Sequence, residues 1–167
     1  NRISSHMLFY GAFGTDVGIF GTAFMYGFRE REEIQQIFES VSGARMMHSF
    51  IRVGGVARDL PEGFPERVEV TLDQVRRAID EADRLLTYSE IMMERTRNVG
   101  VIKGPDAVDW GLSGPTLRGS GVLHDVRIDE PYQLYDRFNF EIPLGANGDC
   151  WDRYWVRMEE MRQSVVI

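Results

Sequence analysis

The first strong pattern along the chain is an apolar run over residues 7–28, in which Asp16 is the single charged side chain. A helix of 22 residues can span a bilayer, but a helix buried on all sides inside a protein gives the same signal. Five glycines interrupt the run, and glycine lowers helix propensity: Gly11, Gly14, Gly18, Gly21 and Gly27. We therefore expect a buried helix rather than a membrane span, with a kink or break near residues 18–21. The first three glycines lie close to one face, which allows a neighbouring backbone to approach closely.

Two further helices follow from the spacing of apolar residues. Residues 29–41 repeat apolar side chains at helical spacing, and we expect their charges, including Glu30, Glu32 and Glu33, to form a solvated face. Pro65 begins a long helix with an apolar stripe typical of one wall of a helix bundle. The stripe consists of Phe64, Val68, Leu72, Val75, Ile79, Ala82 and Leu86. We expect Ser89 to cap a shorter continuation over residues 90–97.

The last third of the chain changes from a loop-rich segment to a helix. Glycine and proline are frequent between residues 99 and 148, where we expect a helical turn or two at 106–110 and a short strand at 122–128. Asp149 is placed to cap the final helix. We expect a core-facing side made of Trp151, Tyr154, Trp155, Met158, Met161 and Val165, and an outward side made of Arg153, Arg157, Glu159 and Glu160.

Together these elements predict one mainly α domain built as a helix bundle with a few short strands. Its parts are a helical pair (1–42), a charged junction (43–63), a long bundle helix (64–98), the loop-rich segment (99–148) and the C-terminal helix (149–167). The pattern is already helical at residue 1 and still helical at residue 167. We therefore interpret the chain as an internal fragment of a larger domain.

Composition removes several classes of function. The net charge of −7 argues against a nucleic acid as partner, because an acidic surface repels phosphate. One cysteine, Cys150, cannot form an internal disulfide, and three scattered histidines offer no metal-ligand spacing. The chain has neither a glycine-rich phosphate loop nor a Gly-x-Ser-x-Gly nucleophile elbow. We expect Cys150 to be a small buried residue and Gly119-Ser120-Gly121 to be a flexible turn.

The remaining candidates for a functional site are polar and charged residues in apolar surroundings. A lone carboxylate in an apolar stretch costs free energy unless it is paired, so Asp16 is a site candidate from solvation alone. The junction contributes Arg45, His48, Arg52 and Asp59 around a β-favouring run, residues 49–53. Structural ion pairing and proton or redox chemistry both explain such a set.

Seven blocks in chain order carry a resemblance to a known family. They are Phe28-Arg-Glu-Arg-Glu32, Ser42-Gly-Ala-Arg-Met46, Gly54-Gly-Val-Ala-Arg-Asp-Leu-Pro61, Gly111-Leu-Ser-Gly-Pro115, Leu117-Arg-Gly-Ser-Gly121, Gly148-Asp-Cys-Trp-Asp-Arg-Tyr154 and Arg157-Met-Glu-Glu-Met-Arg-Gln-Ser164. The chain resembles the middle of the D subunit, the quinone-site subunit, of proton-pumping NADH:quinone oxidoreductase, respiratory complex I. The resemblance covers a little under half of that protein.

The resemblance implies a fold and a function. The fold is that of the NiFe-hydrogenase large subunit without its nickel ligands. The function is quinone reduction next to the terminal 4Fe-4S cluster of the B subunit, coupled to proton translocation, in a complex that also uses NAD and contains the C subunit. The implied location is peripheral, on the cytoplasmic side of the bacterial inner membrane. No cofactor is expected on this chain alone.

The resemblance also implies roles for individual residues. Asp16 matches the family's acidic residue that pairs with a quinone-binding histidine, which precedes Asn1 in the family's order together with a quinone-binding tyrosine. Phe24 matches the wall of the quinone cavity, and Arg45 matches the junction beside the terminal cluster. His48 stands one position after the histidine that tunes this cluster in many members, where the chain has Met47. We therefore expect Asp16 and Arg45 to line one shared chamber.

Two alternatives stay open at this point. A membrane-bound NiFe-hydrogenase large subunit has the same fold and requires Cys-x-x-Cys pairs outside this segment. A catalytically inert relative would hold partners together without reducing quinone.

Overall fold

Eight α-helices and one small strand pair make up the computed structural model, which describes residues 1–167. The helices are α1 (Arg2–Asp16), α2 (Thr22–Ser42), α3 (Phe64–Ala82), α4 (Glu90–Thr96), α5 (Gly104–Asp109), α6 (Gly114–Gly119), α7 (Val126–Asp129) and α8 (Cys150–Val166). The strands are β1 (Ile51–Arg52) and β2 (Gly55–Val56). A π-helical turn (Asp83–Thr87) extends α3, and a 3-10 turn (Tyr135–Arg137) follows α7. The mainly α class is confirmed.

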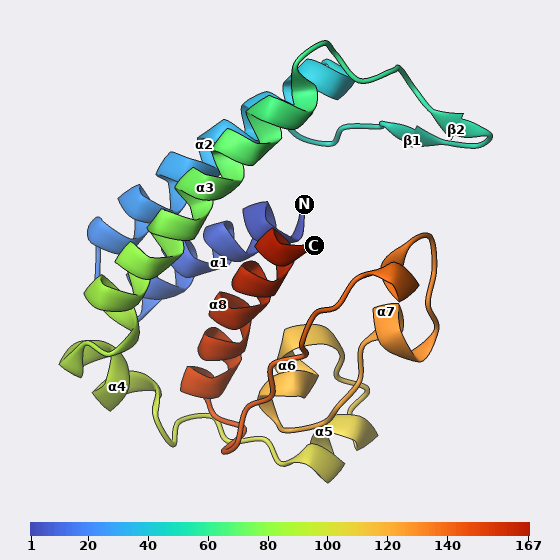
Figure 1. Cartoon of the computed structure of the whole chain (residues 1–167). Helices are drawn as coiled ribbons and strands as arrows, with labels where there is room; N and C mark the ends of the chain where they lie inside the picture. Colours follow the sequence, from blue (N-terminus) through green and yellow to red (C-terminus); the bar gives the residue numbers. More distant parts are fainter.

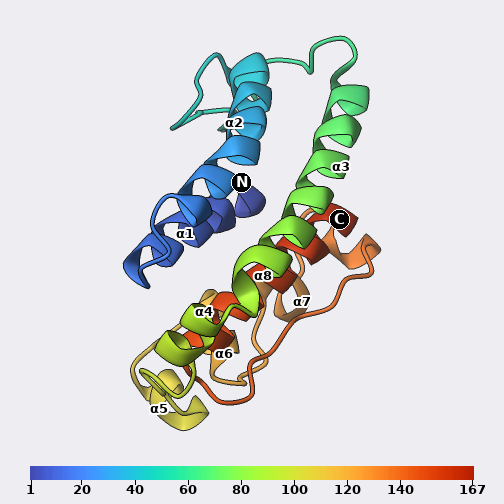
Figure 2. The same ribbon diagram turned by 90° about the vertical axis from the view of Figure 1, so that its left-hand side faces the viewer.

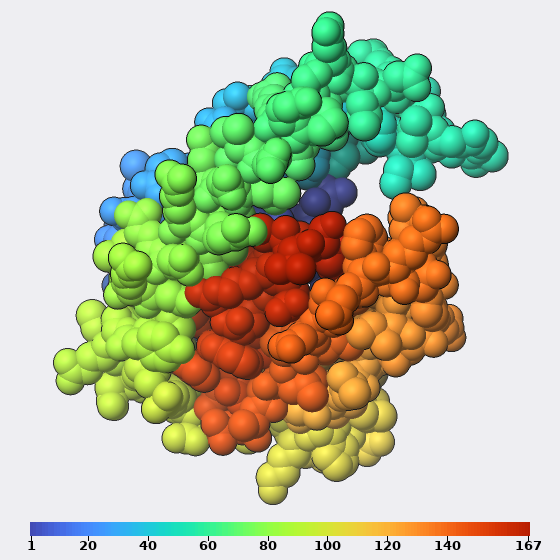
Figure 3. All heavy atoms as spheres, viewed as in Figure 1, coloured from blue at the N-terminus to red at the C-terminus, as the bar shows by residue number.

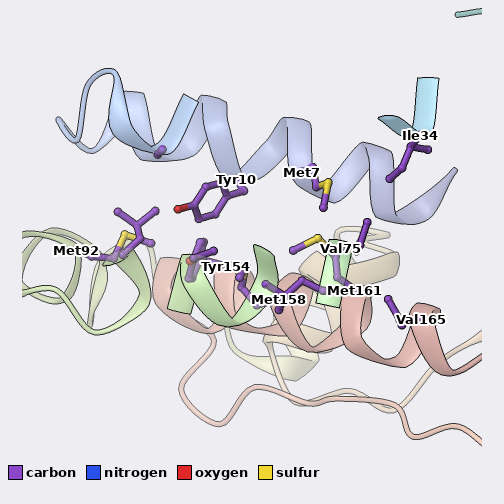
Figure 4. Close-up of a cluster of buried hydrophobic side chains, with 13 residues drawn as sticks. Met7, Tyr10, Ile34, Val75, Met92, Tyr154, Met158, Met161 and Val165 are labelled. Atoms are coloured by element: carbon purple, nitrogen blue, oxygen red, sulfur yellow. The ribbon is translucent and has the colours of Figure 1, made fainter. Parts of the chain in front are cut away.

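Helices α1, α2, α3 and α8 form the bundle, and the two chain ends lie near each other at one side of it (Figures 1 and 2). Helix α8 occupies the centre of the face seen in Figure 3. The core is one cluster whose side chains point inward from α1 and α8 in Figure 4. Its members are Met7, Tyr10, Ala23, Ile34, Val75, Ile79, Ala82, Leu86, Met92, Tyr154, Met158, Met161 and Val165.

The apolar run at 7–28 does not form a single helix. Helix α1 ends at Asp16 and α2 begins at Thr22, and Gly18 and Gly21 adopt positive φ angles of 91° and 85° in the connection. Because such angles strain residues that carry a Cβ, glycine is favoured at both places. The break expected near residues 18–21 is confirmed. No helix in the structure combines the length and the apolarity that crossing a membrane requires.

Glycines also set how closely α1 and α2 pack, as the sequence predicted. A Cβ at Gly14 would overlap with the side chain of Ala23, and a Cβ at Gly27 would lie 2.7 Å from the backbone oxygen of Met7. A Cβ at Gly11 would be 3.3 Å from the Cα of Phe24. The two backbones therefore touch where side chains would otherwise hold them apart.

The predicted stripe of α3 lies on the inner side of the bundle. Val75, Ile79, Ala82 and Leu86 are buried, whereas the first three members of the stripe are half-buried. The predicted cap is confirmed, because the Ser89 hydroxyl accepts a hydrogen bond of 3.3 Å from the Met92 backbone N–H at the start of α4.

The loop-rich segment contains more helix than the sequence predicted. The expected turns at 106–110 are confirmed as α5, but the strand at 122–128 is wrong, since residues 126–129 form α7. The Asp125 side chain accepts a hydrogen bond from the Arg127 backbone N–H, and this cap favours a helical turn over extended backbone. Helix α6, with Pro115 in its first turn, was not predicted.

Two residues expected on outward faces are buried. Glu160 on α8 is 2% exposed, and Glu30 on α2 is 8% exposed. On α8, Trp151 and Trp155 are half-buried rather than central to the core. Both helices are covered on more than one side, so a single apolar stripe does not describe what they bury.

The charged junction forms an arm that stands clear of the bundle (Figures 1 and 3). Ile51 pairs with Val56 and Arg52 with Gly55, in antiparallel register. The two-residue connection uses Gly54 at a φ of 90°. Both strands are exposed, so the arm is held by its own turn and by its roots on α2 and α3.

Replacing Gly14 by Ala tests the close contact of α1 and α2. Alanine gains about 1 kcal/mol of helix propensity, but the overlap with Ala23 forces the helices apart, at a typical cost of about 1–3 kcal/mol for overpacking. We expect a net loss in the free energy of unfolding of the full-length protein, measured by chemical denaturation. Gly11→Ala is the comparison variant: its Cβ would meet Phe24 Cα at 3.3 Å rather than overlap with a neighbour, so it should cost less than Gly14→Ala. Equal effects of the two substitutions would contradict the packing argument.

Candidate functional site

Asp16, the first candidate, is the last residue of α1. Its carboxylate is exposed, and it makes neither a hydrogen bond nor an ion pair with another side chain. The expectation that Asp16 is a buried carboxylate is therefore wrong for this chain. A negative charge in the last turn opposes the helix dipole, and α1 has no basic residue there to offset it. Asp16 therefore destabilises the end of α1, and residues that break a local stability rule are often found at functional sites.

Phe24 lies in the first turn of α2, close to the turn that follows Asp16. Its ring is 45% exposed and stacks on Phe28, with ring centroids 4.2 Å apart. These two rings, Met25, Tyr26 and Arg29 line an open hollow of about 520 Å³. Phe20 and Met25 are still more exposed. The α1–α2 end of the bundle therefore carries both a carboxylate and an apolar, aromatic surface.

Arg45 follows the opposite end of α2. Gly43 ends this helix in the left-handed conformation, φ 79°, which turns the chain away from the bundle. The guanidinium is exposed and pairs with Glu32 and, at 3.4 Å, with Glu39. Arg52 and Asp59 further along the arm are also exposed. The apolar settings expected for these three residues are therefore absent.

His48, in the same junction, is half-buried. The ring stacks on Phe38, with centroids 4.4 Å apart, and its Nε2 lies 3.0 Å from the side-chain oxygen of Asn1. Its Nδ1 is buried without a hydrogen-bond partner. His48 and Arg45 both line a polar hollow of about 340 Å³, so the structure brings these two candidates together.

Asp16 and Arg45 do not line a shared chamber. The 21 residues of α2 separate them, and at a rise of 1.5 Å per residue such a helix is about 30 Å long. The hollow beside Phe24 and the hollow beside His48 have no residue in common. The expectation of one chamber is wrong for this chain, which instead presents two separate candidate surfaces.

A third polar group, which the sequence analysis missed, lies inside the molecule around Glu160. The Glu160 carboxylate accepts hydrogen bonds of 2.7 Å from His6 Nε2 and from Arg118 Nε, and Arg2 approaches it at 3.5 Å. These partners come from α1 and α6, so one carboxylate joins α8 to two other elements. No sequence spacing points to this, because Arg118 and His6 are 42 and 154 residues away.

Asp125 extends the group into the loop-rich segment. It holds the Arg127 guanidinium through two hydrogen bonds, of 2.9 and 2.8 Å, and Arg118 approaches it at 3.7 Å. All three of these side chains are at least 94% buried. The ring of Phe140 lies 4.4 Å from the Arg127 guanidinium and covers it from solvent.

Charge states follow from these contacts. Burial raises the pKa of Asp125, but the hydrogen bonds and charge of Arg127 outweigh it and bring the pKa to about 2. Burial also raises the pKa of Glu160, and the bonds from His6 and Arg118 more than offset that and lower it. Burial lowers the pKa of His6 despite the bond to Glu160. At neutral pH a neutral imidazole therefore donates to an ionised carboxylate.

The buried ion pairs around Glu160 are better suited to holding helices together than to binding a metal ion. No three His, Cys, Asp or Glu side chains lie close enough together to hold a metal ion. Cys150, half-buried, has its sulfur 3.2 Å from an Arg153 nitrogen. The group around Glu160 is an internal ion-pair network that fixes three helices.

Comparison with known proteins identifies the chain. Residues 16–167 match the family described as "Respiratory-chain NADH dehydrogenase, 49 Kd subunit". The chain belongs to this 49 kDa family. It is 49% identical over its full 167 residues to the D subunit of NADH-quinone oxidoreductase from Desulforamulus reducens, and covers 45% of that protein. It is 48% identical to the D subunit from Methylacidiphilum infernorum and 51% identical to a D-type subunit from Chloroflexus aurantiacus, covering 39% and 40% of them.

The resemblance seen in the seven sequence blocks is therefore confirmed. The chain spans less than half the length of these curated relatives of the 49 kDa family. The names of these three relatives say NADH-quinone oxidoreductase rather than hydrogenase.

Replacing Glu160 by Gln tests the network. Removing the Glu160 charge breaks a buried ion pair and leaves Arg118 with only the more distant Asp125, at 3.7 Å, as counter-charge. We expect a loss of about 3 kcal/mol in the free energy of unfolding of the full-length protein. Glu159→Gln is the control at the neighbouring position, because Glu159 pairs with Arg162 near the surface. Its loss should stay below about 1 kcal/mol. Similar losses for both variants would show that Glu160 faces outward, as its sequence pattern suggested.

Proposed function

We propose that this chain forms part of the quinone-reducing region of a proton-translocating NADH:quinone oxidoreductase. The observation that carries the proposal is the family match, with 49% identity over the whole chain to a protein named as the D subunit of NADH-quinone oxidoreductase. The chain works only within the complex, in which other proteins oxidise NADH and carry electrons to a terminal 4Fe-4S cluster. Quinone is the electron acceptor.

The α1–α2 end is the part that we assign to quinone. A quinone headgroup is a flat ring with two carbonyl oxygens, and the exposed ring of Phe24, stacked on the half-buried ring of Phe28, offers an apolar surface of matching shape. Asp16 ends α1, just before the turn that leads to this surface, and has no ion partner in the chain. We assign to it the role of pairing with a histidine outside this segment. A carboxylate hydrogen-bonded to imidazole favours the protonated ring, which can then donate a proton to reduced quinone.

The arm side is the part that we assign to the cluster-bearing partner, the B subunit. Arg45 places a fixed positive charge at the root of the arm, and positive charge near an iron–sulfur cluster raises its reduction potential. His48 lines the same hollow as Arg45 and is the second candidate for contact with the cluster.

The exposed surface supports a role inside an assembly. The chain exposes 10129 Å², whereas a monomeric globular protein of this size exposes about 8,400 Å². Large apolar side chains are exposed both beside Phe24 and on the arm, and contiguous apolar patches mark interaction sites. We assign these surfaces to the rest of the same protein and to the B and C subunits. In the complex the chain would lie peripherally, on the cytoplasmic side of the bacterial inner membrane.

Replacing Asp16 by Asn in the intact complex tests the proton role. Asparagine keeps the shape but removes the charge that holds the histidine protonated. We expect quinone reduction to fall by about 100-fold, within the range for losing acid–base help, with NADH oxidation by an artificial acceptor unchanged. Asp109→Asn, at an exposed position on α5, is the control. Equal loss of both activities would mean that Asp16 is structural.

Replacing Arg45 by Gln tests the proposed field at the cluster. Removing a unit positive charge from the neighbourhood of the partner's terminal cluster should lower its midpoint potential, by an amount on the order of tens of millivolts. Arg45→Lys keeps the charge and should leave the potential nearly unchanged. Redox titration followed by electron paramagnetic resonance measures both. Identical potentials in all three proteins would remove Arg45 from the proposal.

A further inference from the structure

A small, partly open hollow lies where the four bundle helices meet. Its volume is about 20 Å³, and α1, α2, α3 and α8 all contribute to its wall. The lining side chains are mostly apolar: Met7, Tyr10, Tyr26, Gly27, Glu30, Ala78, Ile79, Ala82 and Met161. A cavity holds one water once its volume reaches about 10–15 Å³. The space is therefore large enough for one water and too small for an organic ligand.

Two polar atoms in this wall lack partners. The Tyr10 hydroxyl and the Glu30 Oε2 are both buried, and neither has a hydrogen-bond partner in the chain. The other carboxylate oxygen of Glu30 accepts a hydrogen bond from Arg29 Nε, and Arg29 also bonds to Glu81 at 2.7 Å. Tyr10 is 3% exposed, and its ring points from α1 toward α8 in Figure 4.

Leaving both atoms unpaired would be costly. A buried polar group without a partner loses about 1–3 kcal/mol, and more if it is charged. The Tyr10 hydroxyl and the Glu30 Oε2 do not form a hydrogen bond with each other. Since both residues line the same hollow of one-water size, one water between them can serve as partner to both atoms.

We propose that this cavity is a binding site for one structural water that bridges the Tyr10 hydroxyl and the Glu30 carboxylate. The water accepts a hydrogen bond from the phenol and donates one of its own to Glu30 Oε2. It thereby joins α1 to α2 beside Gly27, where the two backbones are in contact. No step of the proposed quinone chemistry depends on it.

The direction of these bonds follows from the charges around the cavity. Burial, and then the negative charges of Asp83 and Glu81, raise the pKa of Tyr10, so its hydroxyl keeps its proton and acts as donor. Glu30 accepts a hydrogen bond from Arg29 on its other oxygen, and Oε2 of the same carboxylate offers a second acceptor. A donor on one wall and an acceptor on the other match the two roles of one water molecule.

The test is a structure of the assembled complex at a resolution that shows ordered waters. We expect one density peak within hydrogen-bond distance of both Tyr10 Oη and Glu30 Oε2. The peak should be lost in Tyr10→Phe and retained in Tyr26→Phe. Tyr26 lines the same cavity but is half-buried, and its hydroxyl is not an unpartnered buried atom, so it is the matched control.

Hydrogen exchange of the backbone amides gives a second readout on the same complexes. Tyr10→Phe leaves Glu30 unpaired, so the exchange of α1 amides should accelerate roughly tenfold, while Tyr26→Phe should not change it. An empty cavity, a side chain from elsewhere in the protein filling it, or a direct Tyr10–Glu30 bond in a collapsed cavity would each overturn the proposal. So would a peak that survives Tyr10→Phe at full strength.

Discussion

The arrangement of the bundle against the loop-rich segment depends on one buried charge, the carboxylate of Glu160. An ionised group in a core is tolerated only when opposite charges and hydrogen bonds surround it. Arg118 and His6 meet this need, and both come from positions far along the chain. The Glu160 carboxylate thereby links α1 and α6 to α8. The ion network, and not apolar contact alone, decides where residues 99–148 pack against the bundle. The segment's many exposed apolar side chains, such as Leu123 and Tyr132, are consistent with this.

The α1–α2 connection depends on a different constraint, the space beside glycine. The Arg95 guanidinium of α4 donates a hydrogen bond of 2.6 Å to the Val17 backbone oxygen, and it packs where a Cβ of residue 18 would stand. A helix outside the pair therefore braces the connection that carries Asp16. The exposed carboxylate consequently stands on a fixed turn although it makes no contact of its own.

Elements whose pattern is local could be predicted from the sequence, whereas sites made by distant residues could not. The stripe of α3, the break at Gly18 and Gly21 and the Ser89 cap follow from neighbours within a few positions. Glu160 was assigned to solvent because it stands two residues from Met158, off the apolar stripe of α8. It is buried because α1 and α6 cover that second face, which no local spacing reports. The prediction for Asp16 was wrong in the opposite direction, because it expected burial and the carboxylate is exposed. An apolar run in the sequence does not distinguish a core from an exposed apolar surface.

Helix α2 finally determines what the two candidate surfaces can do together. It packs along α1 and α3, and it carries the aromatic surface at one end and the arm at the other. Met47 is 94% exposed at a positive φ of 53°, a conformation that costs free energy for a residue with a side chain. Phe20, at the opposite end, is 84% exposed. An exposed apolar side chain therefore stands beyond each end of α2, and the length of this helix fixes the separation of whatever binds at the two surfaces.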